Sequence, residues 1–440
     1  MKQIRFNFVC LFTILIAYSS LAQEKKEKSD LPKIKTGWNF GAIPAITFDT
    51  DQGFQYGAAV NFYNFGDGSI FPKYKHSLYF EISRFTKGSG IYRFYYDSES
   101  LLPGIQVTTD LSYLPDQAYD FYGFNGYESV LNKSWEDQNS PDYKTRMFYK
   151  YQQKLFRFKT DFQGKFSGSK FGWIAGFNLL NYSSASVDID KLNKGKSEGD
   201  KLPPVAQQPG LYEKYIQWGL ISQQEANGGF IPELKGGIVF DTRDFKPNPM
   251  SGMWTEAVIA VVPKFLGAES GFSKFSFTHR QYFTLIKEDL SFAYRVNWQQ
   301  TLGGHVPFYY EPQIISSVLT GSSSTGLGGA KNLRGIRRNR IVGDGYLLGN
   351  LELRWKFYRL KLFNQNFYMG LNTFVDFGQV TKKINTDNVN IPATVNASDY
   401  FNKGAEKLHT SYGAGLRLVM NYNFVMAVDY GIATNSQDGD

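Results

Sequence analysis

The 440-residue sequence has a single cysteine, Cys10, and this residue lies in a segment that we predict to be removed on export. A mature chain without cysteine forms no disulfide and offers no thiolate chemistry. Phe8 and Val9 also lack the small size expected at a lipoprotein cleavage site. These features fit a cell-envelope protein that does not depend on disulfides.

The chain also lacks long hydrophobic runs and a strong charge of either sign. Beyond residue 22, no apolar run approaches the ~18 residues that a helix needs to cross a bilayer. The formal net charge of +8 falls to +6 when Lys2 and Arg5 are removed, and the excess is spread along the sequence. The charge pattern therefore predicts no nucleic-acid partner.

Signatures of an enzyme are poor. The four histidines, at positions 76, 279, 305 and 409, are far apart and lack metal-ligand spacing. The run 321–325 fails the Gly-x-Ser-x-Gly pattern at its last position. Gly195-Lys196-Ser197 is similar to a phosphate loop, but Asp190 stands where the first glycine belongs. We therefore predict no catalytic residues, no metal and no cofactor.

The N-terminus is predicted to be a cleavable signal peptide, residues 1–22. Lys2 and Arg5 precede the apolar run 6–18, and Ser20-Leu21-Ala22 offers small residues for cleavage before Gln23. A signal anchor is the alternative. Residues 23–37 form a short charged segment that is too small for an independent domain, since folds below ~40 residues usually need disulfides or metals.

Aromatic residues and glycine are abundant in what remains. Phe, Tyr and Trp make up 17% of the sequence, which has 38 Phe, 29 Tyr and 43 Gly. Stretches such as 54–63, 290–299 and 347–357 alternate apolar with polar or small residues, which places the charges on one side of a strand but around every face of a helix. We predict an all-β fold, a transmembrane antiparallel β-barrel over residues 38–440.

Fifteen strand segments can be counted. They start near residues 38, 54, 77, 91, 106, 147, 171, 235, 253, 273, 290, 346, 367, 413 and 423. Short turns, as at residues 65–68, contrast with long connections at 114–146, 183–232, 301–345 and 378–410, an asymmetry typical of membrane barrels. The second long connection contains a predicted helix at 211–220.

The last segment runs into Asn435-Ser436-Gln437-Asp438-Gly439-Asp440, which has the composition of a hairpin turn with no returning strand. Bacterial single-chain barrels have even strand numbers, and an open edge in lipid leaves costly unpaired backbone groups. We therefore expect a barrel of sixteen strands whose last strand is missing from this chain; closure in another way is the alternative.

Four motifs occur in order between residues 240 and 417. They are Phe240-Asp241-Thr242-Arg243-Asp244 with Asn248-Pro249-Met250-Ser251-Gly252; Leu333-Arg334-Gly335-Ile336; Phe374-Val375-Asp376-Phe377-Gly378; and Gly413-Ala414-Gly415-Leu416-Arg417. Together they resemble the Omp85 superfamily of outer-membrane barrels, which includes the BAM-complex insertase and two-partner secretion transporters. Ile336 departs from the aromatic residue usual in that family. Residues 23–37 leave no room for the family's periplasmic POTRA domains, so the chain resembles a short, POTRA-less branch.

The resemblance implies that the loop between strands 11 and 12 folds into the lumen and that Arg334 faces Asp376. Asp376 shares the strand parity of Asn372 and Tyr368, opposite to Val375, so it is expected to point inward. A guanidinium can give a carboxylate two parallel hydrogen bonds, which lysine cannot match. Gly335 leaves room for a tight turn. A solvated loop arginine is the alternative interpretation.

The remaining charged motif residues are expected to be structural. Asp241, Arg243 and Asp244 precede Asn-Pro and would fix a strand end and its turn. The loop cations that follow Arg334 could line the lumen against Glu352 or could simply be solvated; they are Arg337, Arg338 and Arg340.

Two functions remain open from the sequence. The first is an outer-membrane protein of a Gram-negative bacterium that moves or assembles polypeptide or lipid, with membrane lipid around it and a periplasmic protein as a possible partner. The second is a passive pore or structural surface barrel. An outer-membrane lipase is a third reading and lacks a Ser/His pair. The oligomeric state and the client are not indicated by the sequence.

Overall fold

The computed structural model describes residues 34–49, 52–246, 248–317, 326–363, 365–387, 389–421 and 424–439. The predicted signal peptide, with Cys10, and residues 23–33 lie outside these ranges, as does the run 321–325. Residues 35–440 form the compact unit described below.

Strands dominate the described residues. They are β1 (Trp38–Pro44), β2 (Thr47–Asp49), β3 (Gly53–Asn64), β4 (His76–Phe85), β5 (Gly90–Leu102), β6 (Ile105–Asp120), β7 (Lys150–Lys165), β8 (Phe171–Ala185), β9 (Gly228–Asp241), β10 (Gly252–Val262), β11 (Phe272–Ile286), β12 (Leu290–Gly304), β13 (Gly345–Leu362), β14 (Gln365–Lys382), β15 (His409–Met420) and β16 (Phe424–Ala433). The α-helices are α2 (Ile189–Asn193) and α3 (Leu211–Gln217). Short 3-10 helices are η2 (Gly126–Glu128), η3 (Lys133–Trp135), η4 (Glu198–Asp200), η5 (Lys264–Leu266) and η6 (Ala397–Asp399).

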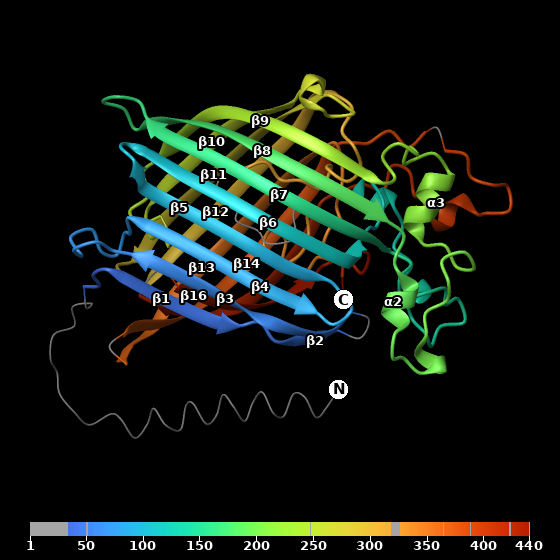
Figure 1. Ribbon diagram of the computed structural model, residues 1–440, viewed down its shortest axis with the longest axis horizontal. Helices are drawn as coiled ribbons and strands as arrows, with labels where there is room; N and C mark the ends of the chain where they lie inside the picture. The colour runs from blue at the N-terminus through green and yellow to red at the C-terminus, as the bar shows by residue number, and fades with distance from the viewer. Residues whose placement is uncertain are drawn as a thin grey trace. The chain divides into compact units, whose positions relative to one another are not determined.

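Within the described ranges, sixteen strands form one antiparallel sheet in which each strand from β3 onward pairs with the next. The sheet curves into a barrel (Figure 1). All fifteen predicted segments correspond to one strand each. The sixteenth, β2, is a three-residue strand that pairs with β3 beyond the end of β1 and that was not among the predicted segments. Because β2 is counted separately, the predicted lumen loop lies between β12 and β13 rather than between strands 11 and 12.

The two ends of the strand order lie beside each other. A Cβ atom on Gly41 of β1 would stand 2.9 Å from the ring of Phe424 on β16, so these strands approach closely. No ladder of paired residues joins β1 to β16 in the described ranges. The sheet is therefore a barrel wall with a seam that backbone hydrogen bonds do not close.

Side chains alternate across the wall as period-two patterning requires. On β14, Asp376 is 0% exposed, whereas its neighbour Val375 is 44% exposed. On β13, Leu351, Leu353 and Trp355 are exposed on the outer face. The expected outer apolar surface and inner polar surface are thus present. No described helix is long and apolar enough to cross a membrane.

The connections differ strongly between the two ends of the barrel. Residues 121–149, 186–227, 305–344 and 383–408 all leave from one end, whereas the connections at the other end are shorter. Figure 1 shows α2 and α3 in the long connections at that end. This is the predicted asymmetry. The predicted helix at 211–220 is shorter than expected, because α3 stops at Gln217 and Gly219 takes a positive φ of 79°.

The long connections share one apolar core that is mainly aromatic. Tyr215 of α3, Phe148 and Tyr310 are fully buried in this core. The rings of Trp135 and Phe148 lie 4.7 Å apart, and those of Phe121 and Tyr215 lie 5.2 Å apart. Since Phe, Tyr and Trp each bury 150–250 Å² in typical cores, these connections form a packed cap rather than separate loops. We call this cluster the aromatic cap.

Residues 435–439 contain the turn expected after the last predicted strand, with the Asp438 N–H donating to the Asn435 carbonyl at 3.0 Å. They also fold back onto the long connections, which the sequence did not predict. The Asp438 carboxylate accepts hydrogen bonds from the Tyr127 hydroxyl and lies 2.6 Å from Nδ1 of His409, while its carbonyl accepts from the Arg337 N–H at 2.7 Å. Polar turn residues suit this position because they satisfy buried donors.

Candidate functional site

The loop that follows β12 enters the barrel and is fixed there by a small apolar core. Leu333, Ile336 and Ile341 of the loop pack with Leu348 of β13 and Val380 of β14. Leu333 is fully buried. Burial of these aliphatic side chains thus anchors the loop to the inner wall independently of its charged contacts.

Gly335 allows the tip of this loop to touch the barrel wall. Its φ is +85°, a conformation that favours glycine, and a Cβ atom there would stand 2.6 Å from the carbonyl carbon of Gly431 on β16. A Cβ on Gly431 would in turn stand 2.7 Å from the Gly335 nitrogen. Two glycine backbones therefore pack directly against each other.

Arg334 makes the central contact of the loop. Its backbone N–H and its Nε both donate to Oδ2 of Asp376, at 2.9 and 2.8 Å, and Nη2 donates to Oδ1 at 2.8 Å. Nη1 donates to Oε1 of Glu352 on β13 at 2.6 Å. The guanidinium also lies over the Phe374 ring, 3.7 Å from its centroid. One side chain is therefore held by two carboxylates and an aromatic face.

Alternate residues of β14 meet consecutive residues of the loop. Phe374 lies under the Arg334 guanidinium, Asp376 binds it, and Gly378 leaves room for Leu333, whose Cδ1 would stand 2.7 Å from a Cβ there. These β14 positions share one face because strand side chains alternate. The Phe-x-Asp-x-Gly spacing on β14 thus places an aromatic ring, a carboxylate and a space where Leu333 and Arg334 of the loop need them.

Neighbouring polar residues hold the two carboxylates. Asn350 donates to Oδ1 of Asp376 at 2.7 Å and to the Asn332 carbonyl at 2.6 Å. Arg354 donates to the second oxygen of Glu352 at 2.7 Å. Burial disfavours the charged form of Arg334, but hydrogen bonding to Asp376 and the charges of Glu352 and Asp376 outweigh it and raise the pKa of Arg334. The loop arginine is therefore charged at every physiological pH.

The loop cations that follow Arg334 bind elsewhere, so the expectation that they face Glu352 was wrong. Arg338 pairs with Asp116 at 3.0 Å and with Asp120, both on β6. Arg337 lies 3.3 Å from Glu136. The physical reason is that the end of β6 and the connection 121–149 lie against the loop and bring their own acceptors.

Arg340 shows the same effect most clearly, because it is fully buried and is held by backbone carbonyls. It donates to Gly126 at 2.8 Å, Ser129 at 2.9 Å and Gln437 at 2.7 Å. The solvated-loop alternative is therefore also wrong for this residue. Arg340 joins the lumen loop to the long connection and to the segment 435–439.

The turn between β9 and β10 contains the Asp-Thr-Arg-Asp motif. Arg243 donates to Asp241 from its backbone N–H at 3.1 Å, from Nε at 2.9 Å and from Nη2 at 2.8 Å. Oδ1 of Asp244 accepts the backbone N–H groups of Phe245 and Met250, at 2.8 and 3.1 Å. These residues occupy the turn-fixing positions that the sequence suggested.

The Gly-x-Gly-Leu-Arg strand provides space on the inner wall. A Cβ on Gly413 would lie 2.0 Å from the Tyr430 carbonyl oxygen and 2.6 Å from the Phe374 ring. At Gly415 it would lie 1.8 Å from Oδ1 of Asp429, which accepts from Arg417 at 2.7 Å. The two glycines therefore make room for the ring beneath Arg334 and for a second arginine–carboxylate pair.

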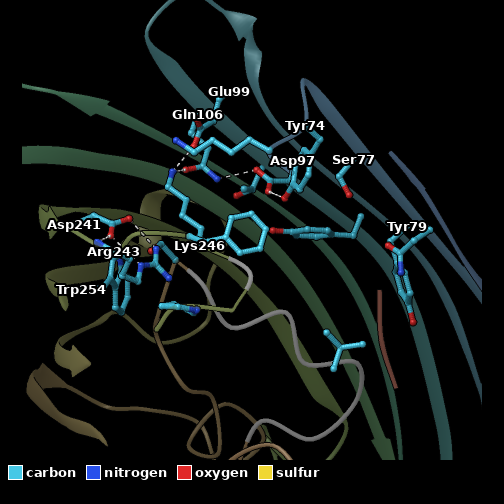
Figure 2. A pocket seen from close by; sticks show the side chains of 18 of the residues that line it. Tyr74, Ser77, Tyr79, Asp97, Glu99, Gln106, Asp241, Arg243, Lys246 and Trp254 are labelled. Carbon is cyan, nitrogen blue, oxygen red and sulfur yellow. Dashed lines mark hydrogen bonds and ion pairs between the residues drawn. The ribbon is translucent and has the colours of Figure 1, made fainter. Parts of the chain in front are cut away.

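A cavity of about 760 Å³ lies within the barrel and reaches the short turns. Figure 2 shows Arg243 beside Asp241 and Trp254 on one side and Asp97 facing Tyr74 on the other. Tyr74 donates to Asp97 at 2.6 Å. Lys246, from the turn between β9 and β10, reaches across to Glu99 and to Gln106, the latter at 2.9 Å. Polar and aromatic side chains thus line the interior.

Sequence reasoning missed Asn350 and Asp438. Asn350 has the parity of Glu352 and lies opposite Asp376 in the strand register, so alternation could have found it. Asp438 had no comparable signal, because its partners come from connections distant in sequence. Within the described ranges, no three His, Cys, Asp or Glu side chains gather as they would to hold a metal ion.

The fold and the loop contacts define a class: a β-barrel of the outer-membrane type with an arginine loop bound to its inner wall. The family model described as the Omp85 superfamily domain matches residues 106–440. The chain belongs to the Omp85 superfamily, whose barrels are bacterial outer-membrane proteins. A comparison with curated proteins finds no match.

Solved structures resemble the chain at low identity. CdiB from Escherichia coli has 10% identity and a TM-score of 0.52, with 92% of this chain and 60% of that chain covered. BamA from Haemophilus ducreyi lacking POTRA domains 1–3 has 15% identity and a TM-score of 0.48, with 92% and 68% covered. This chain therefore spans about three fifths of that CdiB chain, and the likeness to CdiB supports the fold alone.

Proposed function

We propose that this protein translocates or assembles polypeptide or lipid at the outer membrane of a Gram-negative bacterium, and that Arg334 latches its loop inside the barrel. The observation that carries the latch is the set of hydrogen bonds from Arg334 to Asp376 and Glu352. Export by the signal peptide 1–22 belongs to this proposal. Membrane lipid, a polypeptide or lipid client, and a periplasmic protein are the proposed partners.

The cost of separating a buried ion pair favours two states of the loop, one bound to the inner wall through Arg334 and one released from it. Removing one partner from a buried ion pair costs about 3–5 kcal/mol, since the remaining charge loses its compensation. Asp376 is fully buried, and its charge would be left inside the barrel without Arg334. Moving the loop out into the cavity then relieves that charge by admitting water. Packed interfaces of this kind switch between discrete arrangements rather than deforming gradually.

The loop also borders the space through which a client or ion would pass. Lys331, three residues before Arg334, lines the cavity of about 760 Å³. Displacing the loop would therefore widen the interior from within. This links the latch to transport rather than to wall stability alone.

The test is conductance in planar lipid bilayers. We expect small, irregular openings for the natural protein and larger, steadier ones for Arg334→Ala, because the freed loop no longer narrows the lumen. Arg417→Ala is a matched control, since it breaks the Arg417–Asp429 pair on the same inner wall without touching the loop. Its conductance should resemble that of the natural protein.

Equal and stable conductance in the natural protein and in Arg334→Ala would instead identify a passive pore with a fixed loop. An increase in Arg417→Ala as large as that in Arg334→Ala would mean that any lost wall charge has this effect. Either result contradicts the latch.

A further inference from the structure

A second cavity, of about 280 Å³, lies beneath the lumen loop and carries an excess of positive charge. Two carboxylates line it, Glu352 and Asp429. Six cations also line it: Arg280, Arg295, Lys331, Arg334, Arg354 and Arg417. Because low-dielectric walls strengthen charge interactions, such an excess attracts an anion.

Three of these cations already have carboxylate partners. Arg334 and Arg354 share Glu352, and Arg417 pairs with Asp429. The other three, Arg280, Arg295 and Lys331, form no ion pair with a carboxylate in the described part of the chain. The cations without an ion-pair partner therefore lie together, with Glu256 near Arg280 and with Asp376 and Glu352 near Arg295 as the surrounding negative charges.

Strand register places Arg280 and Arg295 directly opposite each other. They are Cα partners on β11 and β12 and point to the same inner face. Like charges directly opposite on neighbouring strands destabilise a sheet. An anion between the two guanidinium groups would remove this repulsion.

Their hydrogen-bonding capacity is also incompletely used. Nε of Arg280 is buried without a hydrogen-bond partner in the described residues, while the guanidinium lies 5.0 Å from the centroid of the Trp254 ring. Arg295 donates from Nε to a neutral acceptor, Oδ1 of Asn350, at 2.7 Å. The nearby Glu256 is engaged by the Ser317 N–H at 3.0 Å and by the Ser317 hydroxyl.

Lys331 completes the arrangement from the loop side. It is exposed to the lumen and lines both cavities, as do Arg280 and Arg354. The wall thus supplies two cations and the docked loop supplies a third. The larger cavity connects this point with the short turns, so a dissolved anion has a route to it.

From this arrangement we infer that Arg280, Arg295 and Lys331 form a binding site for a phosphate group. Two planar guanidinium groups suit the oxygens of a phosphate, and three unpaired cations match a dianion better than a singly charged carboxylate. The phosphate can be a dissolved ion or ester or the headgroup of a lipid. The site does not depend on the proposed transport role.

Thermal unfolding of the full chain in neutral detergent tests the site. Inorganic phosphate should raise the melting temperature above that in sodium chloride of equal ionic strength, because a ligand bound only to the folded state stabilises it. Lys331→Gln should bind phosphate about tenfold more weakly or worse, since a hydrogen bond to a charged group is lost. Arg280→Gln should abolish the response.

Lys331→Gln is the safer variant, because its side chain is exposed and its loss leaves the wall intact. Arg359→Gln and Lys403→Gln remove exposed cations outside both cavities and should respond like the natural protein. A parallel measurement in phosphatidylcholine vesicles, with and without phosphatidic acid, distinguishes the two sources of phosphate.

Stabilisation by dissolved phosphate, lost in Lys331→Gln, supports a soluble ligand. Stabilisation by phosphatidic acid alone, with the same loss, supports a lipid headgroup. No response of the natural protein to either probe overturns the site. So does a response in Lys331→Gln and Arg280→Gln that equals the response of the natural protein. Since conductance of Arg334→Ala is a separate measurement, the latch can survive the failure of this site, and the reverse also holds.

Discussion

Asp376 is the residue on which the docked loop depends most. Its carboxylate accepts hydrogen bonds from Arg334 and Asn350. Because the side chain is fully buried, water does not reach it to replace these hydrogen bonds. Without Asp376, Asn350 would keep its other acceptor, the Asn332 carbonyl, whereas Arg334 would keep only Glu352. The cost of losing Asp376 is therefore mainly the cost of leaving the buried Arg334 cation with one of its two carboxylates.

A pair of substitutions separates this effect from packing. Asp376→Leu alone should lower the free energy of unfolding by up to about 3–5 kcal/mol, because the buried Arg334 loses the carboxylate that accepts three of its hydrogen bonds and keeps only Glu352. Arg334→Met combined with Asp376→Leu should recover much of the loss, since no buried charge lacks a partner. Urea unfolding in detergent measures both. If the double variant lost as much as the two single variants added together, the pair would not be coupled.

For single residues, strand parity predicted which side chains of the barrel wall point inward, but it did not predict the partners of loop residues. It predicted that Asp376 points inward, while the lack of a side chain at Gly335 predicted a tight turn there. It did not assign partners to Arg337, Arg338 and Arg340, because their acceptors come from β6 and from the connection 121–149. Alternation tells which side of a strand a residue faces, and says nothing about which connection will fold over that side.

Strands β15 and β16 show how glycine controls the fit between elements. The Tyr430 carbonyl oxygen lies where a side chain on Gly413 would begin, and the Phe374 ring fills the space beside it. The missing side chain at Gly413 thus lets β16 pair closely with β15 and leaves room for the Phe374 ring beneath Arg334. A side chain at this position would press on both.

We predict that Gly413→Ala destabilises the barrel by about 1–3 kcal/mol, as overpacking of a tight site usually does. The β15–β16 ladder must shift because the obstacle is backbone. Gly303→Ala on β12 is the matched control, since a Cβ there meets nothing within 4 Å. Thermal unfolding in detergent compares them, and an equal melting temperature for the two variants would contradict this account.

Strand positions were predictable because each one repeats a local signal. All fifteen predicted segments correspond to strands, since apolar and polar or small residues alternate along most of them. The short β2 escaped because three residues carry too little pattern. The helix at 211–220 was extended too far: Gly219 takes a positive φ just beyond the helix, and a glycine there is a helix-stop signal that the prediction did not use.

At the scale of the whole molecule, the aromatic cap unites connections that are separate in sequence. Tyr215, from the connection between β8 and β9, contacts Phe121 and Phe124 from the connection between β6 and β7. Its hydroxyl lies 3.1 Å from the Ser129 hydroxyl. The abundance of aromatic residues was considered together with a barrel wall in the sequence analysis, but part of it packs in this cap. Composition gives the amount of aromatic surface and not its location.

Tyr215→Ala should open the cap by creating a large cavity, with a loss of about 3–5 kcal/mol in the stability of the connections, as for other buried aromatic residues. Limited proteolysis should then cut the connections faster, while the circular dichroism of the strands stays unchanged. Tyr430→Ala is the control, because Tyr430 is exposed on the outer wall. Cleavage that is equally slow in both variants would show that the connections do not stabilise one another.

The shared cap has a consequence for how the protein is seen from outside the cell, where the long connections of such barrels lie. Because distant stretches of chain are packed into one body, an antibody or phage meets a composite surface assembled from several of them. Short peptides copied from any single connection would have the right sequence but would not adopt the conformation that it has in the packed cap.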